Sequence, residues 1–255
     1  MKTAAILVSF GTSHEDARKN SLERIYRDIQ AVNPEIFVYE AYTSGMILDK
    51  LSSENLHIDT VDQAVLRALK DGVERLYVVL THMIPGIEYQ KLRRMLDQYQ
   101  SDFKEVNVTT PVLNEEEDCE KLIPILRDMF QFCDKYEYIL MGHGSEDAAN
   151  IRYAQMNQAF QRAGMYNVRI ASVEAKPDLE DAIEELKKRG NKKKVLLYPF
   201  MVVAGDHAKN DMAGEEDSYV SELRENGYQT EAYIKGLGEY PQFRRIYVDK
   251  FQKIQ

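Results

Sequence analysis

The chain has 255 residues, of which 44% are hydrophobic and 29% are charged, a balance typical of a folded globular protein. Its formal net charge of −9 argues against a nucleic-acid partner, because binding to phosphates needs concentrated lysine and arginine. No apolar stretch approaches the roughly 20 residues that a membrane-crossing helix needs, so we expect no membrane partner either.

Apolar, β-rich runs alternate with longer amphipathic segments along the chain. The strands predicted in the first half are Ala4–Phe10, Ile36–Tyr42, Leu76–Thr81 and Val106–Thr110, and the helices are Glu15–Asn33, Val61–Asp71 and Glu88–Tyr99. The strands predicted in the second half are Tyr136–Met141, Val168–Val173, Val195–Phe200 and Thr230–Ile234, and the helices are Glu115–Phe132, Asp147–Ala163, Leu179–Arg189, Asp211–Asn226 and Pro241–Lys253. Continuous apolar strands separated by helices indicate parallel sheets covered on both faces, so we predict an α/β fold.

The first apolar run follows a lysine and superficially resembles the start of an export signal. It is short, and the segment from Ser9 to Asp16 turns polar without a small-x-small cleavage site, so we interpret the run as a buried strand. The two cysteines, Cys119 and Cys133, have no C-x-x-C spacing, and a structural disulfide is not expected. We therefore expect a cytoplasmic protein.

The two halves of the chain resemble each other, which indicates an internal duplication. The segment Ser9–Ala17 resembles Gly142–Ala148, because in both a strand ends in a glycine-containing turn before polar residues that can cap a helix. The segment Leu80–Glu88 resembles Tyr198–His207 with a one-residue insertion. We predict two similar lobes, residues 1–115 and 116–255, each with a four-stranded parallel sheet, which meet at a cleft. The last helix could pack back on the first lobe.

Three ligand-type side chains follow strands of the second half. His143 stands between two glycines after one strand, Glu174 follows the next, and His207 lies shortly after the third. The carboxyl ends of parallel strands share one edge of a sheet, where ligands bind, so we expect these side chains to converge. Two imidazoles and a carboxylate suit a divalent transition metal, proton transfer, or both. Asp206, or Asn210 and Asp211, are candidates for fixing the His207 ring.

Further residues at the predicted strand ends are candidates for lining a ligand site. His82 ends a strand at the same edge, and Glu88 aligns with His207 in the internal repeat, although it is equally typical of the first turn of a helix. The backbone N–H groups of Gly11, Thr12 and Ser13 could bind an anion, and a helix cap explains this segment equally well. Methionines near the edge that could contact a flat organic ligand are Met83 and Met201.

Motifs spread over essentially the whole chain resemble those of the anaerobic sirohydrochlorin cobalt chelatases of cobalamin biosynthesis, class II chelatases of the CbiK type. These motifs are Ser9–Ser13, Ala41–Ile47, Met141–Gly144, Ala204–Met212 and the C-terminal Gly236–Pro241. The resemblance implies a bilobal fold of two similar α/β halves, related to ferrochelatase, with a tetrapyrrole in the cleft between them.

The same resemblance implies insertion of Co²⁺ into sirohydrochlorin, with His143, Glu174 and His207 as the metal site. His143, assisted by Glu174, is then expected to take a pyrrole proton, and Glu88 is the cleft acid of the other lobe. The metal is a substrate, and no organic cofactor is expected. The residues expected to contact the tetrapyrrole are Phe10, Gly11, Thr12, Ser44, His82, Met83, Glu88 and Met201.

Other functions fit the same ligand set. Imidazole and carboxylate also suit Fe²⁺, Ni²⁺ and Zn²⁺, so an iron or nickel chelatase acting on the same ring is an alternative. A tetrapyrrole or haem carrier without turnover is another. A zinc hydrolase is a third, but the chain has no His-Glu-x-x-His pairing and no additional general base next to the ligands. The sequence leaves the oligomeric state open, a homo-oligomer included.

Overall fold

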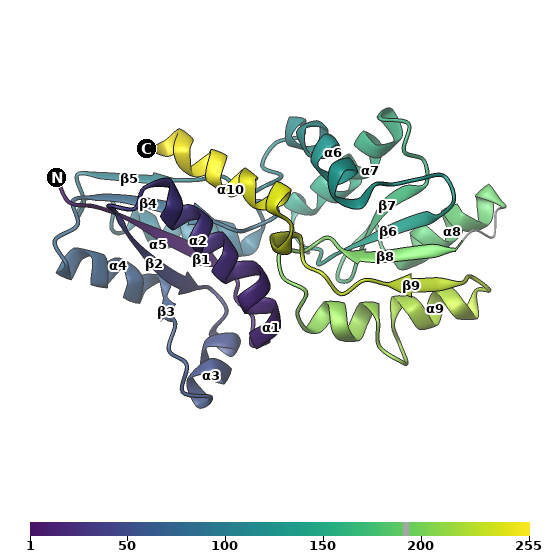
Figure 1. Ribbon diagram of the computed structural model, residues 1–255, viewed down its shortest axis with the longest axis horizontal. Coiled ribbons are helices and arrows are strands. Elements are labelled where there is room, and N and C mark those ends of the chain that lie inside the picture. The colour runs from purple at the N-terminus through teal and green to yellow at the C-terminus, as the bar shows by residue number, and fades with distance from the viewer. Residues whose placement is uncertain (191–193) are drawn as a thin grey trace. The chain divides into compact units, whose positions relative to one another are not determined.

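The computed structural model describes residues 1–190 and 194–255 and divides into two compact units (Figure 1). Unit 1 comprises Met1–Val112 and Phe243–Gln255, and unit 2 comprises Leu113–Gln242. Each unit contains one parallel sheet flanked by helices, so the predicted α/β class is confirmed. Among the described residues, no helix is long and apolar enough to cross a membrane.

The sheet of unit 1 has the strand order β3-β2-β1-β4-β5, and its neighbouring strands are parallel. The strands are β1 (Thr3–Ser9), β2 (Phe37–Tyr42), β3 (Asp59–Thr60), β4 (Arg75–Leu80) and β5 (Glu105–Val108). The central strand β1 is buried from Ala4 to Ser9, as expected for a strand covered on both faces. The prediction of four strands in this sheet is wrong, because β3 was missed. Its two residues are too few to show a periodic pattern.

The helices of unit 1 follow the strands in the order predicted, with one addition. They are α1 (Glu15–Ala17), the π-helical η1 (Arg18–Leu22), α2 (Glu23–Val32), α3 (Gly45–Ser53), α4 (Val61–Lys70), α5 (Ile87–Asp97) and α10 (Pro241–Ile254). Helix α4 begins with a capping box, in which Thr60 and Gln63 exchange side-chain and backbone hydrogen bonds. Helix α3 was not predicted. It buries only Leu51, so it lacks the apolar stripe that marks an amphipathic helix.

Side chains of the unit 1 sheet alternate between two apolar layers. On one face, Ile6 and Val78 pack in a cluster with Val65 of α4 and Leu92 of α5. On the opposite face, Tyr77 meets α10, and its ring centroid lies 5.8 Å from that of Phe251. Figure 1 shows α10, in yellow, running along unit 1 although it follows unit 2 in the sequence.

The sheet of unit 2 has the order β7-β6-β8-β9 and is also parallel. Its strands are β6 (Glu137–Gly142), β7 (Val168–Ser172), β8 (Val195–Pro199) and β9 (Thr230–Ala232). The helical segments are α6 (Glu117–Phe130), η2 (Ala148–Asn150), α7 (Ile151–Arg162), α8 (Leu179–Arg189), η3 (Ala208–Met212), α9 (Tyr219–Glu225) and η4 (Leu237–Glu239). One face of the sheet packs with α8, η3 and α9 in a single apolar cluster. On the other face, the Asn157 side chain of α7 exchanges hydrogen bonds with the backbone of Ile170.

The single helix predicted over Asp211–Asn226 is wrong. The π-helical η3 ends at Met212, and α9 begins only at Tyr219 after a Ser218 capping box. Asp217 between them has a φ of 47°, in the left-handed region that a continuous α-helix does not allow. The separate element η3 contains Asp211, which follows His207 by about one helical turn.

Candidate metal centre

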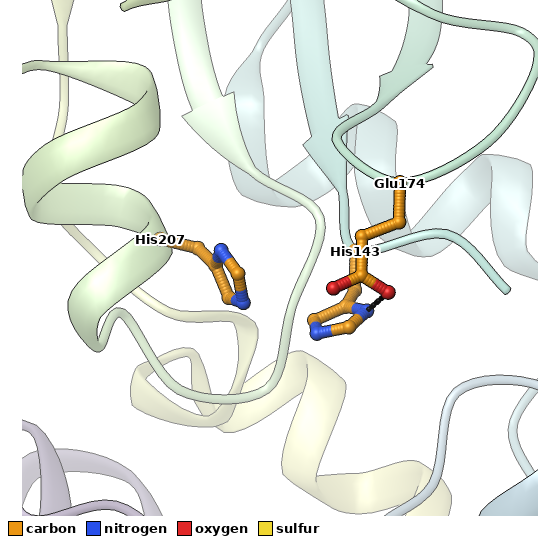
Figure 2. A group of neighbouring side chains, drawn as sticks. All are labelled: His143, Glu174 and His207. Atoms are coloured by element: carbon orange, nitrogen blue, oxygen red, sulfur yellow. Dashed lines mark ion pairs between the residues drawn. The ribbon is translucent and has the colours of Figure 1, made fainter.

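The three predicted ligands follow the carboxyl ends of three adjacent strands of unit 2. His143 comes directly after β6, Glu174 lies two residues beyond β7, and His207 lies in the segment between β8 and η3. Parallel pairing brings these strand ends to one edge of the sheet. Figure 2 shows the three side chains turned toward one another in front of that edge. The predicted convergence is therefore found in the structure.

The ligand atoms of the group lie within 4.8 Å of one another. His143 Nδ1 lies 3.4 Å from Glu174 Oε2, and the two imidazole rings meet edge to face with their centroids 4.6 Å apart. Within residues 1–190 and 194–255, no other group of three His, Cys, Asp or Glu side chains reaches this proximity. The arrangement can hold one divalent cation between two nitrogens and one oxygen.

The loop after β6 is shaped by Gly144, which has a φ of 96°. A Cβ atom at this position would lie 3.1 Å from the amide nitrogen of Glu174 and 3.0 Å from that of Ala175. The Glu174 amide also donates a 2.9 Å hydrogen bond to the His143 carbonyl. The absent side chain of Gly144 therefore lets the His143 loop and the Glu174 loop lie in direct contact.

A second residue that ties the two loops together is Asn150. Its side-chain oxygen accepts a 3.0 Å hydrogen bond from Ser145 N, and its side-chain amide donates to the Lys176 carbonyl. Sequence reasoning did not identify this residue. A polar side chain at the start of a helix carries no local sign that it bridges to a segment 26 residues later.

The hydrogen bonds of the two histidines define their tautomers. His207 Nδ1 lies 2.7 Å from Asp211 Oδ2, and His143 Nδ1 lies 3.2 Å from the Gly144 carbonyl oxygen. Carboxylate and carbonyl oxygens only accept, so Nδ1 is the donor in both contacts. The lone pair of each ring is therefore on Nε2. In Figure 2 these second nitrogens of His143 and His207 point toward each other across the gap between the rings.

The group is accessible from solvent. The side chains of His143, Glu174 and His207 are 40%, 47% and 37% exposed. A structural metal site is closed by its protein ligands, whereas this one leaves room for water or a further ligand. The ligands are also oxygen and nitrogen donors, so they bind an ion less firmly than a set of thiolates would.

The predicted contact residues of unit 1 follow the carboxyl ends of β1 and β2. Phe10 is half exposed directly after β1, and Gly11 has a φ of 101° where a Cβ would collide with the Tyr42 ring. Thr12 is buried, and its hydroxyl oxygen accepts a hydrogen bond from His14 N. Ser44 caps α3, and its amide donates to the Phe10 carbonyl. Helix capping therefore accounts for part of what these polar residues do.

The candidates after β4 have a different environment. Both ring nitrogens of His82 are shielded from solvent and lack a hydrogen-bond partner, and burial lowers the pKa of His82 to about 4, opposed by the charge of Glu88. Glu88 lies in the first turn of α5 and forms a 2.8 Å ion pair with Lys91. Met83 is half-buried. In unit 2, Met201 packs against the apolar cluster, and its carbonyl accepts a hydrogen bond from Leu237.

Comparison with known proteins identifies relatives over the full chain. The family model described as "Cobalt chelatase (CbiK)" matches residues 3–255. The sirohydrochlorin cobaltochelatase of Salmonella typhimurium is 33% identical over 251 residues, which cover 97% of this chain and 94% of the relative. The sirohydrochlorin cobaltochelatase CbiKC of Nitratidesulfovibrio vulgaris is 26% identical over 253 residues, covering 97% and 89%.

A solved structure supports the fold. The structure of SirB from Bacillus subtilis with Fe³⁺ matches with a TM-score of 0.67 and 15% sequence identity, and the match covers all of this chain and 96% of SirB. At this identity the match is evidence for the fold alone, and it agrees with the chelatase-like architecture implied by the sequence motifs. The family resemblance seen in those motifs is confirmed by the family model and the relatives.

Proposed function

Since the chain belongs to the cobalt chelatase (CbiK) family, it is a metal chelatase, and we propose that it inserts Co²⁺ into sirohydrochlorin at the site formed by His143, Glu174 and His207. One observation carries this assignment of residues. The ligand atoms of these three side chains lie within 4.8 Å of one another at one sheet edge. No other part of the described chain offers a comparable set of ligands for the metal that the family inserts.

The chemistry of insertion requires a site that releases its ion. The reaction replaces two pyrrole N–H protons with one divalent cation, so the protein must hold the metal, surrender it, and accept protons. Two neutral imidazoles and one carboxylate satisfy the first two needs, because all three are partly exposed and none is a thiolate. Solvent access also leaves coordination positions at which ring nitrogens can replace protein ligands.

In the proposed proton step, His143 is the acceptor. A pyrrole N–H bond breaks, its electron pair stays on the ring nitrogen, and the proton passes to Nε2 of His143 once that nitrogen has released the metal. The resulting imidazolium is stabilised by Glu174, whose Oε2 lies 3.4 Å from Nδ1 on the other side of the ring. Loss of the proton to water then regenerates the neutral ligand. The second pyrrole proton leaves by the same route or directly to solvent.

The substrate contacts proposed for the tetrapyrrole remain those inferred from the sequence. Phe10, Gly11, Thr12 and Ser44 follow β1 and β2, while His82, Met83 and Glu88 follow β4, so all seven lie at the carboxyl edge of the unit 1 sheet. Ligands of parallel α/β sheets bind at this edge, which supports the assignment. Met201 follows β8 at the corresponding edge of unit 2.

The three ligands alone do not determine which metal the protein inserts. The order of divalent metal affinities for nitrogen and oxygen donors favours Ni²⁺ and Cu²⁺ over Co²⁺, so the His-His-Glu set does not by itself prefer cobalt. The family supports Co²⁺. We propose Co²⁺ as the metal used in the cytoplasm, with Fe²⁺ and Ni²⁺ as ions that the same site can insert in vitro.

The test is anaerobic incubation of the purified protein with sirohydrochlorin and Co²⁺, Fe²⁺ or Ni²⁺, following the absorption of the pigment. We expect repeated turnover with Co²⁺, and a loss of roughly 100-fold or more in rate for His207→Ala, because removal of a nitrogen ligand should cost more than the roughly 10–100-fold that follows loss of a ligand's hydrogen-bond partner. The exposed loop residue His57 provides the matched control, His57→Ala, which should keep wild-type activity.

Two results would contradict the proposal. No acceleration over the protein-free reaction with any of the three metals would exclude a chelatase acting on this ring. Stoichiometric retention of the pigment without further turnover would instead assign the protein to the carrier class. Circular dichroism of His207→Ala ensures that a lost rate reflects the site rather than the fold.

A further inference from the structure

The two histidines of the metal site have different partners at Nδ1. His207 Nδ1 lies 2.7 Å from Asp211 Oδ2, a short bond to a carboxylate. His143 Nδ1 lies 3.2 Å from the neutral Gly144 carbonyl and 3.4 Å from Glu174 Oε2. Glu174 is itself a proposed metal ligand, whereas Asp211 is not part of that group. Of the two acids, only the one beside His143 belongs to the group of proposed metal ligands.

The His207–Asp211 pair is built into one helical turn. Asp211 follows His207 by four residues, and side chains at this spacing lie on the same face of a helical segment. Lys209 N donates to the Gly205 carbonyl in this turn. Ala208 and Met212 are fully buried in the apolar cluster of unit 2 and anchor η3 to the sheet. Asp211 thus lies in the anchored η3, and His207 directly precedes it.

We propose that Asp211 is a positioning residue, which presets His207 to bind through Nε2 and makes His207 the ligand that retains Co²⁺ until transfer. A carboxylate partner at Nδ1 fixes the tautomer and ring orientation and makes Nε2 a stronger donor. His143 has only the neutral Gly144 carbonyl and the proposed ligand Glu174 at Nδ1, which fits its proposed role as proton acceptor. The inference rests on the proposed metal site and adds that its two histidines have different roles, His207 in retaining the metal and His143 in accepting a proton.

Removal of the Asp211 carboxylate should act mainly on the affinity of the protein for Co²⁺. Loss of the hydrogen-bond partner of a metal-bound histidine typically lowers metal affinity about 10–100-fold, and we expect this range for Asp211→Ala. Asp211→Asn keeps an acceptor oxygen without the negative charge, so its affinity should lie between those of Asp211→Ala and the wild type. Glu215, an exposed acid just after η3, provides the control Glu215→Gln with the same change in net charge.

The experiment measures Co²⁺ binding to the full chain under anaerobic conditions without sirohydrochlorin. Competition against a fluorescent chelator gives the dissociation constant, and the visible absorption bands of bound Co²⁺ report its coordination. We expect weaker binding and altered bands for Asp211→Ala, and wild-type behaviour for Glu215→Gln. In the chelatase assay, Asp211→Ala should raise the KM for Co²⁺ more than it lowers kcat.

Wild-type affinity and unchanged bands in Asp211→Ala would overturn the inference, whatever its chelatase activity. If that variant does not fold, Asp211→Asn decides, and an affinity equal to the wild type overturns the inference equally. Failure of the proposed function is recognised separately, because the wild type would then bind Co²⁺ without accelerating its insertion into sirohydrochlorin.

Discussion

His82 has the most unusual environment among the histidines of the chain. Its ring nitrogens are shielded from solvent without a hydrogen-bond partner, and burial lowers its pKa to about 4. An imidazole whose nitrogens are shielded and whose pKa is lowered opposes folding in acid, because the unfolded chain takes up the proton more readily. This residue therefore links the stability of unit 1 to pH.

We expect His82 to make the protein lose stability as the pH falls from about 6.5 to about 4. Within this window the unfolded state binds more protons, so the free energy of unfolding falls by about 1.4 kcal/mol per pH unit from this group alone. Urea unfolding at pH 7 and pH 4.5 should show that His82→Gln loses about 2–3 kcal/mol less than the wild type over this range. His57→Gln is the control at an exposed site, and an equal pH dependence in His82→Gln and the wild type would refute the assignment.

At the scale of elements, the site depends on how closely two loops approach. The loop after β6 and the loop after β7 touch at Gly144, where a side chain would meet backbone nitrogens at 3.0 and 3.1 Å. The Glu174 nitrogen cannot move freely, since its amide is bonded to the His143 carbonyl. The positions of His143 and Glu174 are therefore coupled through backbone contacts.

Gly144→Ala should damage the metal site more than the fold. The φ of 96° strains any residue with a Cβ, at a cost of about 1–2 kcal/mol, and the added methyl group pushes the Glu174 loop away. Gly164→Ala is a matched control, because Gly164 has a φ of 73° and a Cβ added there would meet no atom within 4 Å. Both variants should lose stability in urea through backbone strain, Gly144→Ala more because of its added contacts, but only Gly144→Ala should weaken Co²⁺ binding. Equal Co²⁺ affinities in the two variants would contradict the proposed coupling.

At the scale of the whole molecule, unit 1 is assembled from both ends of the chain. Phe243, Tyr247 and Phe251 of α10 are fully buried, and the Tyr247 hydroxyl donates to the Thr81 carbonyl. Arg244 of α10 also forms a 2.6 Å ion pair with Asp28 of α2. All three metal ligands belong to unit 2, however. Unit 1 can therefore be weakened without any change to the ligand set.

Phe251→Ala should destabilise unit 1 by about 3–5 kcal/mol, the usual cost of removing a buried phenyl ring, because the lost ring leaves a cavity beside Tyr77. Co²⁺ binding should persist at urea concentrations that already unfold unit 1, which would appear as two separate transitions. Phe37→Ala, at an exposed position of β2, should change stability little. If Co²⁺ binding were lost at the same urea concentrations at which unit 1 unfolds, the prediction that the metal site of unit 2 survives the unfolding of unit 1 would be contradicted.

Much of this architecture was predictable from local patterns. Eight of the strands and most helices follow from apolar periodicity, since burial of one strand or one helix face is recorded in consecutive residues. The strand β3, the helix α3 and the break before α9 were not predictable in this way. The first is too short to have a period, the second buries a single side chain, and the third depends on a left-handed residue, Asp217.

The metal site, too, was predictable from the sequence only in part. The identities of His143, Glu174 and His207 follow from ligand-type residues placed after predicted strands, and the family follows from motifs in chain order. Their approach to within 4.8 Å, the choice of Asp211 over Asp206 or Asn210 as the partner of His207, and the return of α10 to unit 1 are properties of the folded chain. Periodicity records which residues are buried, but the neighbours of a residue across the fold depend on how the elements pack against one another.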